Sequence, residues 1–291
     1  MLKDVLLDWC ENQYDPDQSG HCGVHCSNRK NCNGNCDDCL DQVHWYPSSN
    51  GRADYTCQNL MYAYVLRFTE KYSQQIATAL STVDLSEYPY FNIFSIGCGA
   101  TPDLMAFEEI VGDQDIYYKG YDRNPLWQPV HNIIENYTKP IPHITAKLRR
   151  EDIFDVFSDG RPARIHYNVV VIQYLLSHLY NTGQQGQTTK LFRGIIENII
   201  LNSSEDSPFL IIITDVDSRF KGRSSWFLFL DMLESAGFSG DAYARSAHSN
   251  GDLGKDRWSH HKNLSCFGNI SYTFEENASE HDGAQLVIEL R

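Results

Sequence analysis

Two glycines separated by one residue, Gly97 and Gly99, follow a short apolar run over residues 91–96. The run predicts a buried strand, and the residues after the glycines predict a helix. Glycine lets a backbone approach a ligand closely, and a helix N-terminus offers free N–H groups. The same pattern is typical of a plain strand-to-helix turn. The glycine pair is therefore a candidate ligand-binding turn that needs support from other residues.

An acidic residue, Asp122, stands at the end of the next predicted strand. A carboxylate at this position can accept hydrogen bonds from both hydroxyls of a ribose. The third glycine of the dinucleotide-binding fingerprint is absent, and Pro102 stands in its place. Because that fingerprint serves a pyrophosphate, the pattern argues against NAD or FAD. It favours a nucleoside ligand that carries no phosphates.

The N-terminal part of the chain is rich in cysteine and poor in aliphatic residues. Such a segment buries little core, so a bound metal would supply its folding energy. Zinc is held by about four thiolate or imidazole ligands in a tetrahedron. The main predicted zinc ligands are Cys32, Cys36, Cys39 and Cys57. Cys22 and Cys26, with His21, His25 or His44, are predicted either to hold a second ion or to substitute in the first site. Free or disulfide-bonded cysteines are the plainer alternative.

Composition excludes several classes of protein. The formal net charge of −14 repels phosphate backbones, so extended nucleic-acid binding is not expected. No apolar run reaches the roughly 18 residues of a membrane span, and the first ten residues lack the apolar stretch of a signal peptide. We therefore expect a cytoplasmic protein without membrane partners. In that reducing location its nine cysteines act as ligands or buried thiols.

Strands and helices alternate after about residue 58. Apolar residues every four positions predict an amphipathic helix over residues 59–80. The predicted strands are 91–96, 116–121, 167–172, 209–214, 268–275 and 284–290. The predicted helices are 104–111, 127–137, 189–202 and 224–236. This order predicts an α/β fold, with a mostly parallel sheet covered by helices on both faces and an antiparallel C-terminal hairpin.

These motifs, in this order, resemble the class I, Rossmann-like S-adenosylmethionine-dependent methyltransferases. Residues 95–99 resemble the first motif, which wraps the methionine part of the cofactor, and Asp122 matches the ribose-binding acid. Asp152 and Ile153 resemble the acid and the apolar residue that contact adenine. The resemblance covers residues 60–291 and implies a seven-stranded sheet. The implied cofactor-binding residues are Ser95, Gly97, Cys98, Gly99, Asp122, Arg123, Asp152, Ile153 and Gln173.

Two positions depart from the pattern of that superfamily. Ser95 stands where an Asp or Glu often contacts the amino group of the cofactor or orders the loop. The segment after the fourth strand, residues 173–178, lacks the Asn-Pro-Pro-Tyr type of motif found in enzymes that methylate base amino groups. The chain accordingly divides into a cysteine-rich metal-binding segment, residues 1–58, and a methyltransferase domain, residues 59–291.

A sulfonium is already a strong methyl donor, so catalysis would consist mainly of proximity and alignment. A base is needed only if the acceptor holds a proton at neutral pH. The candidate catalytic residues, Tyr174 and His178, follow the fourth strand. Asp215 and Asp217, after the fifth strand, are the alternative. We also expect Tyr62 or Tyr64 of the aromatic helix to reach over the pocket.

Three hypotheses of function follow. The first is an S-adenosylmethionine-dependent methyltransferase whose acceptor is undetermined, with a small molecule or a protein favoured over RNA. The second is a non-catalytic, zinc-stabilised interaction module on a Rossmann-like scaffold. The third is a radical S-adenosylmethionine enzyme, because Cys32, Cys36 and Cys39 have the spacing of its cluster motif. Too few strands are predicted for the β/α barrel of that third class.

Overall fold

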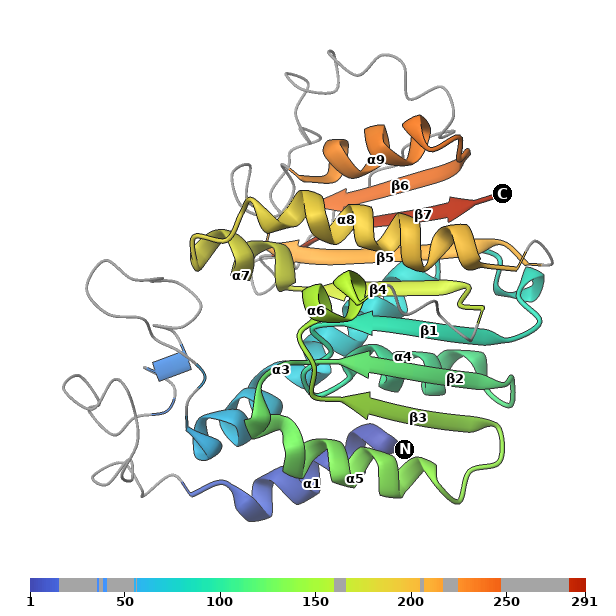
Figure 1. Cartoon of the computed structure of the whole chain (residues 1–291). Coiled ribbons are helices and arrows are strands. Elements are labelled where there is room, and N and C mark those ends of the chain that lie inside the picture. The colour runs from blue at the N-terminus through green and yellow to red at the C-terminus, as the bar shows by residue number, and fades with distance from the viewer. Residues whose placement is uncertain are drawn as a thin grey trace.

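The computed structural model describes residues 1–15, 36, 39–40, 55, 57–159, 166–204, 207–216, 225–246 and 283–291. Within these residues, seven strands form one open sheet in the order β3-β2-β1-β4-β5-β7-β6 (Figure 1). The strands are β1 (Phe91–Ile96), β2 (Ile116–Tyr121), β3 (Ile144–Arg149), β4 (Val169–Gln173), β5 (Phe209–Val216), β6 (Gly240–Ser246) and β7 (Gly283–Leu290).

The first five strands run parallel, and the last two do not. β1 pairs with β2 and β4, β2 with β3, and β4 with β5, all in parallel. Ile96 at the end of β1 is level with Tyr121 of β2 and Ile172 of β4, so the carboxyl ends of these strands meet at one edge. β7 pairs antiparallel with both β5 and β6.

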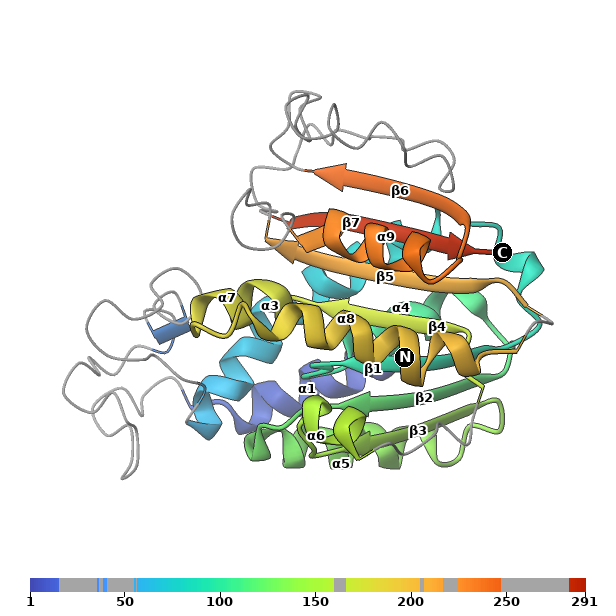
Figure 2. The ribbon, with the colours of Figure 1, turned by 45° about the horizontal axis from the view of Figure 1, so that its top comes forward.

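Helices cover both faces of the sheet (Figures 1 and 2). One layer contains α1 (Leu2–Gln13), α3 (Gln58–Leu80), α4 (Pro102–Val111) and α5 (Gln128–Thr138). The other layer contains α6 (Ile153–Ser158), α7 (Leu175–Asn181), α8 (Gln187–Asn198) and α9 (Trp226–Ser235). Short 3₁₀ turns occur at Leu85–Glu87, Pro125–Trp127 and Ile200–Asn202. Among the described residues, no helix combines the length and apolar character needed to cross a bilayer.

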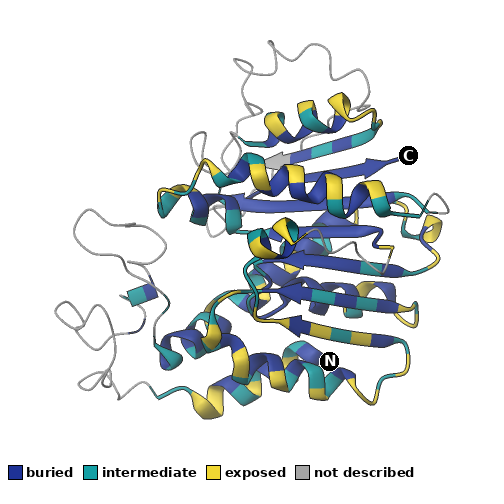
Figure 3. Ribbon diagram, viewed as in Figure 1, coloured by how far each residue is buried: buried dark blue, intermediate teal, exposed yellow. Residues whose placement is uncertain are grey.

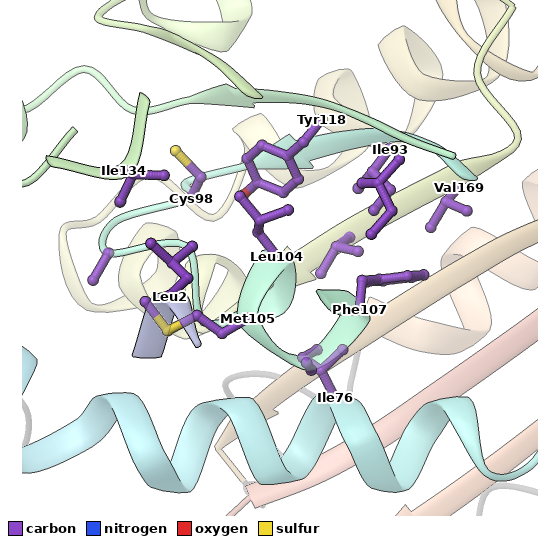
Figure 4. Packing of buried hydrophobic residues seen from close by; sticks show 14 of the residues in the cluster. Leu2, Ile76, Ile93, Cys98, Leu104, Met105, Phe107, Tyr118, Ile134 and Val169 are labelled. Carbon is purple, nitrogen blue, oxygen red and sulfur yellow. The ribbon is translucent and has the colours of Figure 1, made fainter. Parts of the chain in front are cut away.

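Burial explains why the central strands read as continuous apolar runs. Nearly every residue of β1, β4 and β5 is buried, as expected for parallel strands covered on both faces (Figure 3). β3, at the edge, alternates buried and exposed positions more strongly. Ile76 of α3 packs with Phe107 of α4 and with residues of β1 in one cluster (Figure 4). The sheet is therefore the rigid platform from which the turns at its carboxyl edge project.

Most predicted elements occur, and the seven-stranded α/β sheet is confirmed. The antiparallel pairing differs from the prediction. The expected partner of the last strand, residues 268–275, lies outside the described residues, and both edges of β7 are already occupied by β5 and β6. The strand that replaces it, β6, was not predicted. Its alternation of small and polar residues gives little local signal, and its pairing with β7 makes it a strand.

The N-terminal helix α1 was also not predicted. Leu2, Leu6 and Cys10 are buried in the same cluster as α3 and α4. Lys3 forms ion pairs with Glu70 of α3 and Glu109 of α4, at 3.1 and 3.5 Å. Helix α1 therefore packs with the elements of the sheet domain, although the predicted boundary assigned it to the cysteine-rich segment.

Candidate functional site

The strand order reverses between β1 and β4. β2 and β3 lie on one side of β1, whereas β4 and β5 lie on the other. In open α/β sheets, ligands bind outside the carboxyl ends of the strands at such a point. A cavity of about 460 Å³ lies here, lined by turns that follow β1, β2 and β4. Its volume is within the range of about 300–1,000 Å³ that is usual for small-molecule sites.

The turn after β1 depends on its two glycines. The backbone φ angle is 68° at Gly97 and 48° at Gly99. Residues other than glycine rarely adopt these positive values. A Cβ atom at Gly99 would lie 3.3 Å from the Trp127 ring. The N–H groups of Gly97 and Cys98 both donate to the carbonyl of Tyr121, at 2.8 and 3.1 Å. The turn is thereby tied to β2.

Asp122 joins the turns after β1 and β2. Its carboxylate accepts hydrogen bonds from the N–H groups of Gly99, at 3.1 Å, and Asn124, at 2.9 Å. Burial raises the pKa of Asp122 to about 6, and these two hydrogen bonds oppose the rise. His131 Nε2 lies 2.8 Å from the Gly99 carbonyl oxygen and holds the turn from the other side. Asp122 is partly exposed and lines the cavity.

A second acid, Asp152, begins helix α6 at the cavity wall. Its Oδ1 accepts the N–H of Phe154 at 2.9 Å, and its Oδ2 lies 3.2 Å from Nη1 of Arg123. Ile153, the next residue, is buried and lines the same cavity. A carboxylate beside an apolar side chain can accept a hydrogen bond from a ring amino group while the ring packs on the apolar surface.

Aromatic side chains form the wall on the side of β4 and α3. Tyr174 has a φ of 56° and stacks on Tyr72, with ring centroids 4.3 Å apart. Its hydroxyl is 2.9 Å from Nε2 of Gln75. Tyr64 lines the cavity and packs against Trp127 at 5.6 Å. A bulky residue in the left-handed region is strained, and such strain concentrates at functional sites.

Most of the predicted site residues converge on this cavity. The predicted residues that line it are Gly97, Gly99, Asp122, Arg123, Asp152, Ile153, Gln173, Tyr174 and His178. Two predicted residues, Ser95 near the end of β1 and Cys98 in the turn, are buried and line a smaller cavity instead. Of the two tyrosines expected over the pocket, Tyr64 lines it, whereas Tyr62 packs against Trp9 at 5.5 Å.

Several lining residues were not predicted, among them Tyr55, Asn124, Trp127, Leu175 and Asn181. They come from segments that the sequence interprets only as a helix start or a loop. Trp127 had a weak signal, as an aromatic residue at a predicted helix start soon after Asp122.

Asp215, an alternative catalytic candidate, is not among the residues that line this cavity. It is completely buried, with 0 % exposure. Its carboxylate accepts the N–H groups of Ser177, at 3.0 Å, and Val216, at 2.7 Å. Burial raises its pKa to about 6. Asp215 thus ties β5 to α7, and its companion Asp217 lies outside the described residues.

The predicted zinc ligands are described only in part. Cys22, Cys26 and Cys32 lie outside the described residues, as do the three histidines named as substitutes. Cys36 is buried beside Leu40 and Leu60, and Cys39 and Cys57 pack against the same cluster. Within the described part of the chain, no group of three or more His, Cys, Asp or Glu side chains is arranged to hold a metal ion.

Three solved methyltransferase structures are similar to this chain. The plantazolicin methyltransferase BpumL in complex with SAH has a TM-score of 0.45 at 12% identity, over 79% of this chain and 88% of that chain. A SAM-dependent methyltransferase from Archaeoglobus fulgidus has a TM-score of 0.44 at 12% identity, over 78% and 99%. StiE O-MT has a TM-score of 0.40 at 16% identity, over 79% and 74%. No protein-family model matches the sequence, and no curated protein matches it.

Proposed function

We propose that this chain is an S-adenosylmethionine-dependent methyltransferase. The observation that carries the proposal is the convergence of three turns on one cavity at the reversal of strand order. The glycine turn after β1 allows close backbone approach, and Asp122 after β2 is placed to accept hydrogen bonds from a ribose. Asp152 and Ile153 offer the acceptor and the apolar surface that suit adenine.

The start of helix α4 supports a ligand without phosphates. A helix N-terminus after a glycine turn ordinarily attracts a phosphate. Here Asp103, in the first turn of α4, is buried with 2 % exposure. A carboxylate at this position repels an anion, so it opposes a pyrophosphate and favours a neutral or cationic group. S-adenosylmethionine, unlike NAD or FAD, carries no phosphate and carries positive charge.

The bound cofactor would supply a sulfonium that already donates its methyl group readily. The residues of the chain then bind and orient. Gly97, Gly99 and Asp122 hold the nucleoside, while Tyr174 and His178 lie on the wall where an acceptor would approach. Alignment of this kind is worth up to about 7–11 kcal/mol when the geometry is ideal. His178 is the candidate base for an acceptor that must lose a proton.

Calorimetry tests the cofactor assignment directly. We expect S-adenosylhomocysteine and S-adenosylmethionine to bind at one site per chain, and NAD to show no binding. The absence of binding by both sulfur compounds in the metal-replete protein would exclude the methyltransferase assignment. Binding of NAD with comparable affinity would show that the phosphate argument is wrong.

The acceptor side is tested by two alanine variants. Tyr174→Ala and His178→Ala should reduce methyl transfer to the acceptor far more than they reduce affinity for S-adenosylhomocysteine. Tyr180→Ala is the matched control, because this residue is on the same helix but is 40% exposed. We propose a small molecule or a protein as the acceptor class. If both variants bind cofactor and turn over normally, the acceptor approaches from another wall, and if cofactor binding is abolished the pocket is misplaced.

We also propose that the cysteine-rich segment binds zinc. Support comes from the number of cysteines in the segment and from the packing of Cys36, Cys39 and Cys57 around one cluster. Elemental analysis of anaerobically prepared protein should find at least one zinc per chain. Iron with acid-labile sulfide would instead support a radical enzyme, and a metal-free folded protein would exclude both.

A further inference from the structure

A second, much smaller cavity lies beneath the glycine turn. Its volume is about 20 Å³, which is enough for a single non-hydrogen group. Three of its lining residues have a buried oxygen with no hydrogen-bond partner among the described residues. These atoms are Oγ1 of Thr69, Oδ2 of Asp103 and Oε1 of Gln173. Because buried polar atoms are nearly always paired in folded proteins, three orphans around one small cavity require an explanation.

Asp103 and Gln173 each have a second polar atom that makes a hydrogen bond, and this hydrogen bond fixes the orientation of the side chain. The hydroxyl of Tyr118 donates to Oδ1 of Asp103 at 2.9 Å. Within the described part of the chain, no group makes a hydrogen bond of good geometry to Oδ2, although the Ser95 side chain and the N–H of Leu104 act to lower the pKa of this carboxyl. Nε2 of Gln173 donates to the carbonyl of Tyr72 at 3.0 Å. Since only the amide nitrogen can donate to a carbonyl, the unpartnered atom of Gln173 is its oxygen.

The three orphan atoms define the chemistry of the missing partner. A carboxylate oxygen and an amide oxygen are acceptors only, and a hydroxyl can accept as well. Their common partner must donate hydrogen bonds and is best if positively charged, because an unpaired buried carboxylate is costly. A primary ammonium group has three N–H donors and meets both conditions. Burial raises the pKa of Asp103, and an adjacent cation would oppose that rise.

The small cavity adjoins the large one. Tyr64, Gly97, Gly99 and Gln173 line both. A ligand in the large cavity can therefore extend a short arm past the glycine turn toward Asp103. Resting on the function proposed above, we propose that Thr69, Asp103 and Gln173 bind the α-ammonium group of the methionine moiety and so select ligands that carry it.

Two ligands and one isosteric variant test this assignment. The ligands are S-adenosylhomocysteine and its analogue in which hydrogen replaces the α-amino group. In Asp103→Asn, the amide oxygen can still accept the hydrogen bond from the Tyr118 hydroxyl. The amide NH₂ group replaces Oδ2, and because it is a donor it cannot accept a hydrogen bond from an ammonium group. We expect the variant to bind S-adenosylhomocysteine about 10- to 100-fold more weakly than the wild type, and to bind the analogue with less than about twofold change.

The wild-type protein separates the two proposals. If it fails to bind S-adenosylhomocysteine, the function proposed above is wrong. If it binds S-adenosylhomocysteine and its deaminated analogue equally, or if Asp103→Asn weakens both equally, the function stands and the ammonium assignment is overturned. The small cavity would then hold a buried water only.

A second pair of variants decides the matter if Asp103→Asn does not fold. Thr69→Val removes one orphan oxygen without changing the size of the side chain. Thr101→Val is its control: Oγ1 of Thr101 is also buried and has no hydrogen-bond partner in the described part of the chain, but Thr101 does not line the small cavity. We expect Thr69→Val to weaken S-adenosylhomocysteine binding about 3- to 10-fold and Thr101→Val to leave it within about twofold. Equal effects of the two variants would overturn the assignment.

Discussion

Asp122 and Asp215 stand at corresponding places in the molecule. Both lie at the carboxyl edge of the parallel strands, Asp122 directly after β2 and Asp215 next to the last residue of β5. Each accepts hydrogen bonds from two backbone N–H groups. Burial raises both pKa values to about 6. The two acids differ in their access to solvent and to the large cavity. Asp122 is partly exposed at the wall of the large cavity, whereas Asp215 is 0 % exposed and is not among the lining residues.

This pair shows that a buried carboxylate with a shifted pKa does not by itself identify a binding site. The hydrogen bonds of Asp215 join β5 to α7 and stabilise the fold. Those of Asp122 shape the glycine turn, and its free lone pairs remain available to a ligand in the cavity. The predictions below test whether the two acids divide these roles as their access to the cavity indicates.

The largest expected effect is on cofactor affinity. Asp122→Ala should weaken S-adenosylhomocysteine binding by about 1–3 kcal/mol, because charge-assisted hydrogen bonds to the ribose are lost. Asp215→Ala should change it by less than about 0.5 kcal/mol, since this residue does not touch the ligand. Calorimetry on both variants measures the difference. Equal losses would mean that both acids act only through the fold.

For the free energy of unfolding, we expect the variant of Asp215 to have a larger effect than the variant of Asp122. Asp215→Ala should lower the free energy of unfolding by about 1–2 kcal/mol, because it removes the acceptor of the buried Ser177 N–H and of the partly buried Val216 N–H. Asp122→Ala should cost less, because its hydrogen bonds with the N–H groups of Gly99 and Asn124 are only partly buried, whereas the hydrogen bond between Ser177 and Asp215 is fully buried. Urea unfolding monitored by circular dichroism gives both values. A larger loss for Asp122→Ala would contradict the assigned roles.

The pH dependence of binding should follow Asp122. Its protonated form cannot accept two ribose hydrogen bonds, so affinity should fall as the pH drops below about 6, by up to about tenfold per pH unit. Asp122→Asn should flatten this profile, whereas Asp215→Asn should retain it. A profile that survives Asp122→Asn would assign the titration to another group. His131 beside Gly99, whose pKa is lowered by burial, would be the first candidate.

The smallest effect concerns the glycine that Asp122 holds. Gly99→Ala and Gly112→Ala both place a side chain at positive φ, so each should lower stability by about 1 kcal/mol. Only the first puts a Cβ against Trp127, at 3.3 Å, because no atom of the described residues lies within 4 Å of a Cβ at Gly112. Only Gly99→Ala should therefore also weaken cofactor binding, by less than about 1 kcal/mol. Titration of both variants with S-adenosylhomocysteine checks this. Weaker binding by Gly112→Ala would show that the loss of affinity does not depend on the position of Gly99 at the cavity.

Local pattern alone determined much of this protein. The runs at residues 91–96 and 116–121 predict strands with the bounds that the structure has, because strands covered on both faces need uninterrupted apolar sequence. The predicted helix over 59–80, whose apolar stripe has the helical period, begins one residue earlier in the structure, at Gln58. Since the carboxyl ends of parallel strands share one edge, the sequence also predicted that Gly97, Asp122 and Tyr174 would gather there.

Only the tertiary structure decided which polar groups reach the cavity. In the sequence, Asp122 and Asp215 both follow a predicted buried strand. No local pattern shows that the N–H of Ser177 donates a hydrogen bond to Asp215. It also places Thr69, Asp103 and Gln173 on three separate elements, α3, α4 and β4, with no local pattern that joins them. Strand β6 is a strand because β7 supplies its hydrogen bonds. Solvent access, strand pairing and cavity lining depend on contacts between segments that are distant in the chain. Short-range periodicity in the sequence therefore does not predict them.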